Sequence, residues 1–214
     1  MTSWRDLRYL SKLFGGQSIL INRIERNEEK RFDLSTFSSK RNTFADFLQK
    51  FENNTERGRA IYFLRSEIVV NPQLKADYQR PAFITSVLRN RHTGLTIWEP
   101  FDRKPEWKDR ERYYCLVSGK EEFALVSPTF KQAIYSGILE ELEPTETPFD
   151  LFQRLNEKKY PLTQYAEVLQ VKLVPGQCLY VPAYYWVQTR TLEDHSVMLN
   201  FEYEAHSELA TLFF

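Results

Sequence analysis

The side chains best suited to metal or acid–base chemistry are few and scattered in this sequence. The three histidines are His92, His195 and His206, and the two cysteines are Cys115 and Cys178. The run RNRHTG around His92 favours a solvated turn, EDHS around His195 favours a hairpin tip, and His206 lies just past the last predicted strand. None of these residues has the paired spacing of a zinc site. The sequence therefore predicts no metal site and no metal cofactor.

The two cysteines bear on the cellular compartment. Cys115 and Cys178 both lie in apolar, strand-like runs, where a small buried thiol is the common state. We expect free thiols, with a disulfide as the alternative, because disulfides belong to oxidising compartments. An intracellular location follows, cytoplasmic or cytoskeletal and ciliary, with an organelle left open.

Composition restricts the classes of partner. Lys plus Arg and Asp plus Glu both number 29 in the 214 residues, so the formal charge is zero and no global field favours nucleic acid. No apolar run approaches the ~20 residues of a membrane helix, and the start MTSWRDLRYL lacks the apolar core of a secretion signal. We expect no nucleic-acid binding and no direct membrane insertion. The partners expected are other protein subunits of a larger complex.

Three segments combine a capping residue with an amphipathic helical pattern. A capping box satisfies backbone N–H groups at a helix start, and glycine or proline marks the end. The predicted helices run from Ser3 to Gly15-Gly16, from Thr43 with Asp46 and the stripe Phe44, Phe47, Leu48 and Phe51, and from Thr147-Pro148 to before Pro161.

Short β-branched and aromatic runs dominate the rest of the chain. Turn residues separate them, which favours an antiparallel sandwich or barrel. We expect one domain over residues 1–214, with a helical N-terminal buttress at 1–59, a barrel at 60–214 and an exposed charged loop from Phe101 to Arg112. The predicted strands are Ala60–Leu64, Ala82–Leu88, Arg112–Val117, Glu122–Val126, Val168–Val174, Cys178–Val181, Tyr185–Arg190 and Ser196–Tyr203.

An ordered set of motifs in the C-terminal half resembles the cupin-like JmjC family. The resemblance is closest to its small hydroxylases, such as the asparaginyl hydroxylase that acts on hypoxia-inducible factor, and it covers about Ala60 to Tyr203. It implies a double-stranded β-helix, a jelly-roll barrel with flanking N-terminal helices. Active members bind Fe(II) and 2-oxoglutarate and hydroxylate or demethylate a protein side chain. The motifs, in order, are FALVSP, YSG, PFDLF, YPL, VKLVPGQCLYVPAYYW and VMLNFEY.

The resemblance also implies where the metal ligands would stand. The family holds iron with a His-x-Asp or His-x-Glu pair and a second histidine, and Val187 occupies the second histidine's position. Gln188 follows it, but its side chain points to the opposite face of a strand. If Thr96 matches the family threonine, Glu99 and Phe101 occupy the positions of the pair. The metal-ligand positions are therefore degenerate.

The positions that would hold 2-oxoglutarate are also altered by the same comparison. Glu121 occupies the position of a lysine that would pair with the far carboxylate, and its charge would repel that carboxylate. Asn200 matches a family asparagine beside the co-substrate, and Thr96 matches the family threonine. Thr96, Glu121 and Asn200 are thus degenerate co-substrate positions.

These differences predict a protein without catalysis. We expect an inactive JmjC-like cupin that is a structural or protein-binding subunit, without catalytic residues or cofactors. The alternatives are a hydroxylase with unorthodox iron ligands and a metal-free barrel that binds a small molecule. Aromatic anchors are typical of interface centres, so we expect Trp107, Phe213 and Phe214 to contact a partner.

Overall fold

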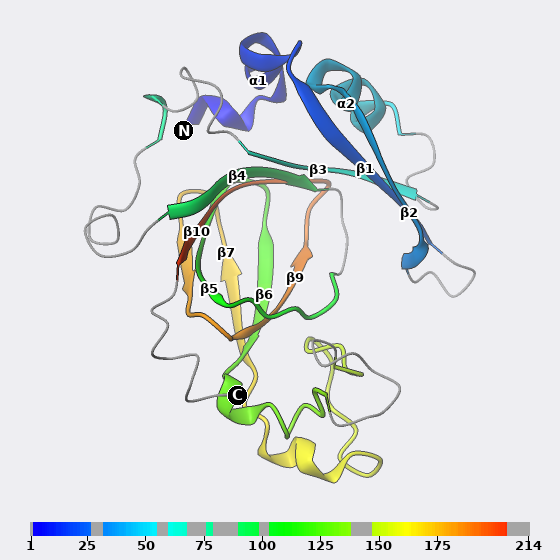
Figure 1. Cartoon of the computed structure of the whole chain (residues 1–214), viewed down its shortest axis with the longest axis vertical. Helices are drawn as coiled ribbons and strands as arrows, with labels where there is room; N and C mark the ends of the chain where they lie inside the picture. The colour runs from blue at the N-terminus through cyan, green and yellow to red at the C-terminus, as the bar shows by residue number, and fades with distance from the viewer. Residues whose placement is uncertain are drawn as a thin grey trace.

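The computed structural model shows two packed antiparallel sheets, with two helices against the outer face of the larger one (Figure 1). It describes residues 2–26, 32–54, 60–67, 76–78, 90–98, 103–137 and 147–204. The helices are α1 (Leu7–Phe14) and α2 (Phe44–Glu52), with 3-10 turns at Thr2–Arg5, Pro128–Phe130 and Pro161–Tyr165. The strands are β1 (Ser18–Arg26), β2 (Phe32–Thr43), β3 (Ala60–Glu67), β4 (Asn90–Trp98), β5 (Arg110–Ser118), β6 (Glu121–Val126), β7 (Leu169–Leu173), β8 (Cys178–Val181), β9 (Trp186–Thr191) and β10 (Ser196–Glu204). None of the helices in these ranges is long and apolar enough to cross a membrane.

The two sheets form a jelly-roll sandwich. The larger sheet has the order β2-β1-β3-β4-β10-β5-β8, and the smaller has the order β7-β6-β9. Each pairing between these strands is antiparallel. The fold is therefore mainly β, as the sequence predicted.

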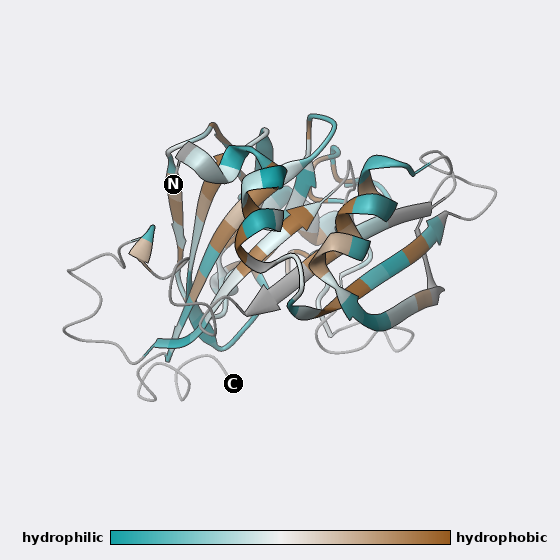
Figure 2. Cartoon of the chain, turned by 90° about the horizontal axis from the view of Figure 1, so that it is seen from above, coloured by the Kyte–Doolittle hydropathy of each residue, from teal (hydrophilic) through white to brown (hydrophobic). Residues whose placement is uncertain are grey.

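The larger sheet buries apolar side chains on both faces. Its outer face packs against α1 and α2, whose ribbons alternate hydrophilic and hydrophobic residues as amphipathic helices do (Figure 2). Residues such as Ile21, Leu95, Leu199 and Phe47 belong to this outer core. The inner face meets the smaller sheet through an apolar group that we call the Val187 cluster. Its buried members are Leu116, Phe123, Leu125, Leu173, Val181, Val187 and Met198.

Helix α2 begins where the sequence predicted. The Thr43 hydroxyl accepts a hydrogen bond from the Asp46 N–H at 3.1 Å, and the Asp46 carboxylate accepts one from the Thr43 N–H at 3.2 Å. Hydrogen bonds from the Thr43 side chain and then from its backbone lower the pKa of Asp46. The capping box therefore orients the apolar stripe of α2 toward the sheet.

Several elements differ from the sequence prediction. Strands β1 and β2 lie in the region predicted as a helical buttress, and β4 places His92 and Gly94 in a strand instead of turns. Residues 147–160 form turns and bends where the third helix was predicted, and the Thr147 hydroxyl, expected to cap it, donates to the Ile134 carbonyl. The first helix starts at Leu7, capped by Asp6, after a 3-10 turn. The predicted strand at residues 82–88 lies outside the described residues.

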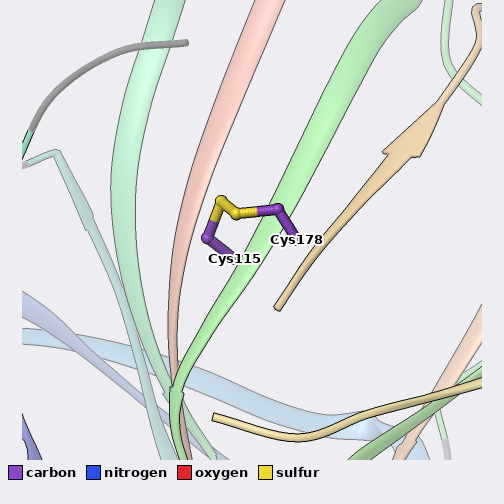
Figure 3. Close-up of a disulfide and its surroundings, with 2 residues drawn as sticks. All are labelled: Cys115 and Cys178. Atoms are coloured by element: carbon purple, nitrogen blue, oxygen red, sulfur yellow. A yellow bond between two sulfur atoms is a disulfide. The ribbon is translucent and has the colours of Figure 1, made fainter. Parts of the chain in front are cut away.

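The expectation of free thiols is wrong. Cys115 in β5 and Cys178 in β8 are joined by a disulfide (Figure 3). Their strands pair so that the two residues lie directly opposite each other, with Cα atoms 4.0 Å apart. Because 63 positions separate them in the chain, only the tertiary pairing reveals this neighbourhood. The disulfide removes the reason for expecting a reducing compartment, and the compartment stays a prediction.

Candidate functional site

Val187 lies in the interior between the two sheets. It sits on β9, opposite Leu125 of β6, and its side chain belongs to the Val187 cluster. Its exposed fraction is 3%. An isopropyl group has no lone pair to offer a metal, so this position contributes only packing.

Gln188 points away from that interior, as predicted. Its side-chain oxygen accepts a hydrogen bond from the Leu151 N–H at 2.6 Å, and its amide donates to Asp150 at 3.0 Å. Successive side chains of a strand alternate between faces. Gln188 therefore fixes the segment after Thr147 on the outside of β9 and does not replace Val187.

The charged segment before β5 lies alongside β9. The Glu106 N–H donates to the Val187 carbonyl at 2.9 Å, and the Val187 N–H donates to the Glu106 carbonyl at 2.8 Å. The Arg103 N–H donates to the Thr189 carbonyl at 2.9 Å. The interpretation of this stretch as an exposed loop holds only in part: Lys104, Glu106 and Asp109 are exposed, but backbone bonds fix Arg103 and Glu106 against the edge of the smaller sheet.

This pairing identifies the residues that neighbour position 187. Ligands of one ion must converge, so partners of Val187 are sought beside it, and Glu106 is the residue that pairs with it. Lys108 follows, and its carbonyl accepts a hydrogen bond from Tyr184 at 2.7 Å. Glu99 and Phe101 lie outside the described residues. Sequence comparison missed Glu106 because the charged stretch looked like an insertion.

Glu121 is the centre of a buried polar group, which we call the Glu121 cluster. Its carboxylate is fully buried and accepts hydrogen bonds from Arg103 at 2.6 Å, from Thr191 at 2.6 Å and from Ser196. The Arg103 guanidinium also contacts Thr189 and stacks over the Trp98 ring at 4.4 Å. The carboxylate is therefore matched by one cation and two hydroxyl donors.

Arg103 is the residue of this cluster that the sequence prediction missed. Glu121 stands where the family resemblance places a lysine, and a carboxylate buried there needs a cation. The charged stretch before β5 was the available source of one. An inward-facing Glu121 together with that stretch was the signal that could have led to Arg103.

Thr96 and Asn200 lie together on the inner face of the larger sheet. The Asn200 amide donates to the Thr96 hydroxyl at 3.0 Å, and that hydroxyl donates to the Met198 carbonyl at 3.4 Å. The side-chain oxygen of Asn200 is buried and has no hydrogen-bond partner among the described residues. The two residues thus form a small polar site whose Asn200 oxygen could accept one further hydrogen bond.

Ion pairs join β10 to the start of β5. Glu202 accepts from Lys108 at 2.8 Å and from Arg110 at 3.1 Å. Arg112 is 1% exposed and donates to the Tyr185 carbonyl at 2.8 Å, while the Glu106 carboxylate lies 4.0 Å from it. The Nε atom of Arg112 has no hydrogen-bond partner within the described part of the chain. Its charge is therefore only weakly matched.

Trp107 is half-buried within the domain. It packs against an apolar group that includes Ala124 and Trp186, with its ring centroid 6.1 Å from that of Tyr184. Phe213 and Phe214 lie outside the described residues. A role of these three residues in partner binding stays a prediction.

A facial triad for Fe(II) needs two imidazoles and a carboxylate at one place. Within the described ranges, no three His, Cys, Asp or Glu side chains gather in a way that could hold a metal ion. His92 lies in β4, and His195 lies in the turn before β10, where its ring packs edge-on against Phe51. His206 is not among the described residues.

Comparison with known proteins places this interior in a family. The profile of the cupin-like domain matches residues 1–209. The tRNA wybutosine-synthesizing protein 5 of Gallus gallus is 27% identical over 129 residues, which are 60% of this chain and 36% of that protein. The Jumonji C domain-containing protein 5 of Drosophila melanogaster is 26% identical over 216 residues, 94% of this chain and 50% of that protein. The chain thus spans half or less of the length of these curated relatives. The match over nearly the whole chain shows that it belongs to the cupin-like domain family.

Proposed function

We propose that the chain is a catalytically inactive JmjC-like cupin that serves as a structural or protein-binding subunit of a larger assembly. The observation that carries this proposal is the Val187 cluster. The resemblance puts an iron-binding histidine at position 187, and a buried valine stands there among apolar side chains. A facial triad needs two imidazoles and a carboxylate around one open face.

The segment beside Val187 supports the same conclusion. Glu106 supplies one carboxylate, but its side chain is 53% exposed and lies 3.8 Å from the Lys108 ammonium. A cation at that distance competes with any metal for the carboxylate. With Val187 opposite, a single carboxylate gives weak and unselective metal binding.

The Glu121 cluster opposes binding of 2-oxoglutarate in the family's manner. A co-substrate carboxylate requires a free cation, and Arg103 is already paired with Glu121 at 2.6 Å. Displacing that pair would leave a buried carboxylate uncompensated, which is strongly unfavourable. Glu121 therefore takes up the charge of Arg103 that a ligand carboxylate would otherwise need.

Iron content and turnover of purified protein test the proposal. After anaerobic reconstitution with Fe(II) and desalting, we expect substoichiometric iron by mass spectrometry and no succinate from 2-oxoglutarate above a boiled control. Glu106→Gln is the matched variant and should behave identically. One retained iron per chain that Glu106→Gln loses, or turnover, would instead support a hydroxylase with unorthodox ligands.

Arg112 favours a second candidate, a metal-free barrel that binds a small anion. This guanidinium is 1% exposed, and the carboxylate of Glu106 lies only at the outer limit of an ion pair, 4.0 Å away. An anionic ligand would complete its charge. Thermal shift with small carboxylates and phosphates, compared between the wild type and Arg112→Met, tests this candidate. Stabilisation of the wild type alone would support it.

A further inference from the structure

Strand β2 offers an unpaired edge. It is the outermost strand of the larger sheet, runs from Phe32 to Thr43 and pairs with β1 on one side. No strand of the described ranges pairs with its other side. The positions from Ser38 to Arg41 are all exposed. Every second residue along this edge therefore presents backbone N–H and C=O groups to another strand.

The side chains along this edge are cationic and partly apolar. Lys40 and Arg41 are adjacent, so they project to opposite faces of the sheet. Neither forms an ion pair with a carboxylate of the described residues. Phe37, which is 49% exposed, shares the face of Arg41, and Leu20 on the neighbouring β1 is 41% exposed. The edge thus combines cations on both faces with apolar surface on one.

We propose that the edge of β2 from Phe37 to Thr43 binds an extended acidic peptide of a protein partner as an added strand. Backbone hydrogen bonds would give affinity, and acidic side chains on either face of the peptide would meet Lys40 and Arg41. An apolar peptide side chain would cover Phe37. This inference rests on the proposed function and specifies the partner class and the surface.

Cations on an edge strand also prevent sheets from joining edge to edge. The two roles respond differently to charge reversal. The double variant Lys40→Glu/Arg41→Glu keeps the edge charged, so the edge should still resist self-association. Its attraction for an acidic strand, in contrast, becomes repulsion. Loss of peptide binding without self-association therefore separates recognition from protection.

The test uses the full chain and three synthetic, fluorescently labelled peptides. The first repeats Glu-Glu-Val-Val over eight residues, which places Glu on both faces of a strand. The second has Lys in place of Glu, and the third is the Val–Glu peptide with every amide N-methylated, which leaves no N–H for a strand ladder. Fluorescence anisotropy measures binding at low and high salt. Hydrogen exchange identifies the protected amides. The matched control is Arg154→Glu/Lys158→Glu, which makes the same charge change in the exposed segment after Thr147.

We expect the Val–Glu peptide alone to bind and to protect amides of residues 37–43. The double variant at positions 40 and 41 should weaken binding at least about 10-fold, high salt should weaken it too, and the control variant should not. Equal binding of the N-methylated peptide, equal binding to the double variant, protection elsewhere or no binding at all would overturn the inference. Succinate formation would overturn the proposed function instead, and it would leave the peptide result interpretable.

Discussion

The Val187 cluster and the Glu121 cluster occupy the same interior, but one is filled by apolar packing and the other by a buried charge with its partners. Both include residues of the paired strands β6 and β9, where Val187 lies opposite Leu125 and Glu121 lies opposite Thr191, four residues along. Around Val187 the surroundings are hydrocarbon. Around Glu121 they are a guanidinium and hydroxyls. An interior position can thus be filled by an apolar side chain, which needs only shape, or by a charge, which needs dedicated partners.

This difference sets how each cluster tolerates change. Apolar packing depends on volume, so the Val187 cluster should tolerate apolar substitutions of similar size and should be destabilised by polar ones. The Glu121 cluster depends on complementarity of charge, so removal of one member leaves another buried and unpaired. Changes to the Glu121 cluster should therefore have the largest effects on stability.

Removing Arg103 should be the most damaging change. Arg103→Met keeps the length of the side chain but leaves the fully buried Glu121 carboxylate without a cation. We expect the free energy of unfolding at pH 7 to fall by about 3–5 kcal/mol. Urea denaturation followed by circular dichroism measures it.

The double variant Arg103→Met/Glu121→Leu is the control for that prediction. With both charges removed, the stability should return close to that of the wild type, because an apolar replacement of a buried ion pair is often neutral or stabilising. A double variant as unstable as Arg103→Met would show that the loss came from the stacking of Arg103 on Trp98 and not from the ion pair.

Introducing a histidine into the apolar cluster should cost less and restore nothing. Val187→His puts an imidazole among the apolar side chains of the Val187 cluster, and we expect a loss of about 1–3 kcal/mol in the free energy of unfolding. Fe(II) should not bind stoichiometrically, because Glu106 is the single carboxylate paired beside it. Val187→Phe, apolar but larger, controls for size. Turnover of 2-oxoglutarate by Val187→His would contradict this prediction.

Local signals predicted much of the fold. Alternating apolar runs located β5 to β10, and the Thr43 capping box located the start of α2. Strands β1 and β2 were missed because exposed polar residues such as Ser38 and Lys40 obscure the strand pattern. The sequence left the disulfide as an alternative and could not decide for it, because it depends on the pairing of β5 with β8 across 63 positions.

The sequence indicated which residues of the interior matter, but it did not indicate which residues they contact. Val187 and Glu121, the positions to which the resemblance led, are both buried in the structure. The resemblance did not reveal that Arg103 reaches Glu121 or that Glu106 pairs with Val187. Both contacts come from a segment whose path is set by backbone bonds to β9, and no periodic pattern encodes that path.

Asn200 lies on β10, two residues beyond Met198 of the Val187 cluster, and should respond least. Its amide donates to Thr96, while its oxygen is buried without a partner in the described part of the chain. Asn200→Leu removes that unsatisfied acceptor along with one neutral hydrogen bond, so the two effects oppose each other and stability should change by less than about 1 kcal/mol. Asn200→Asp, measured in the same urea titration, places a charge at this position and should be clearly worse. A loss above about 2 kcal/mol for Asn200→Leu would mean that the oxygen is occupied by a bound water or ligand, which would favour the small-molecule barrel over an interior closed by its own side chains.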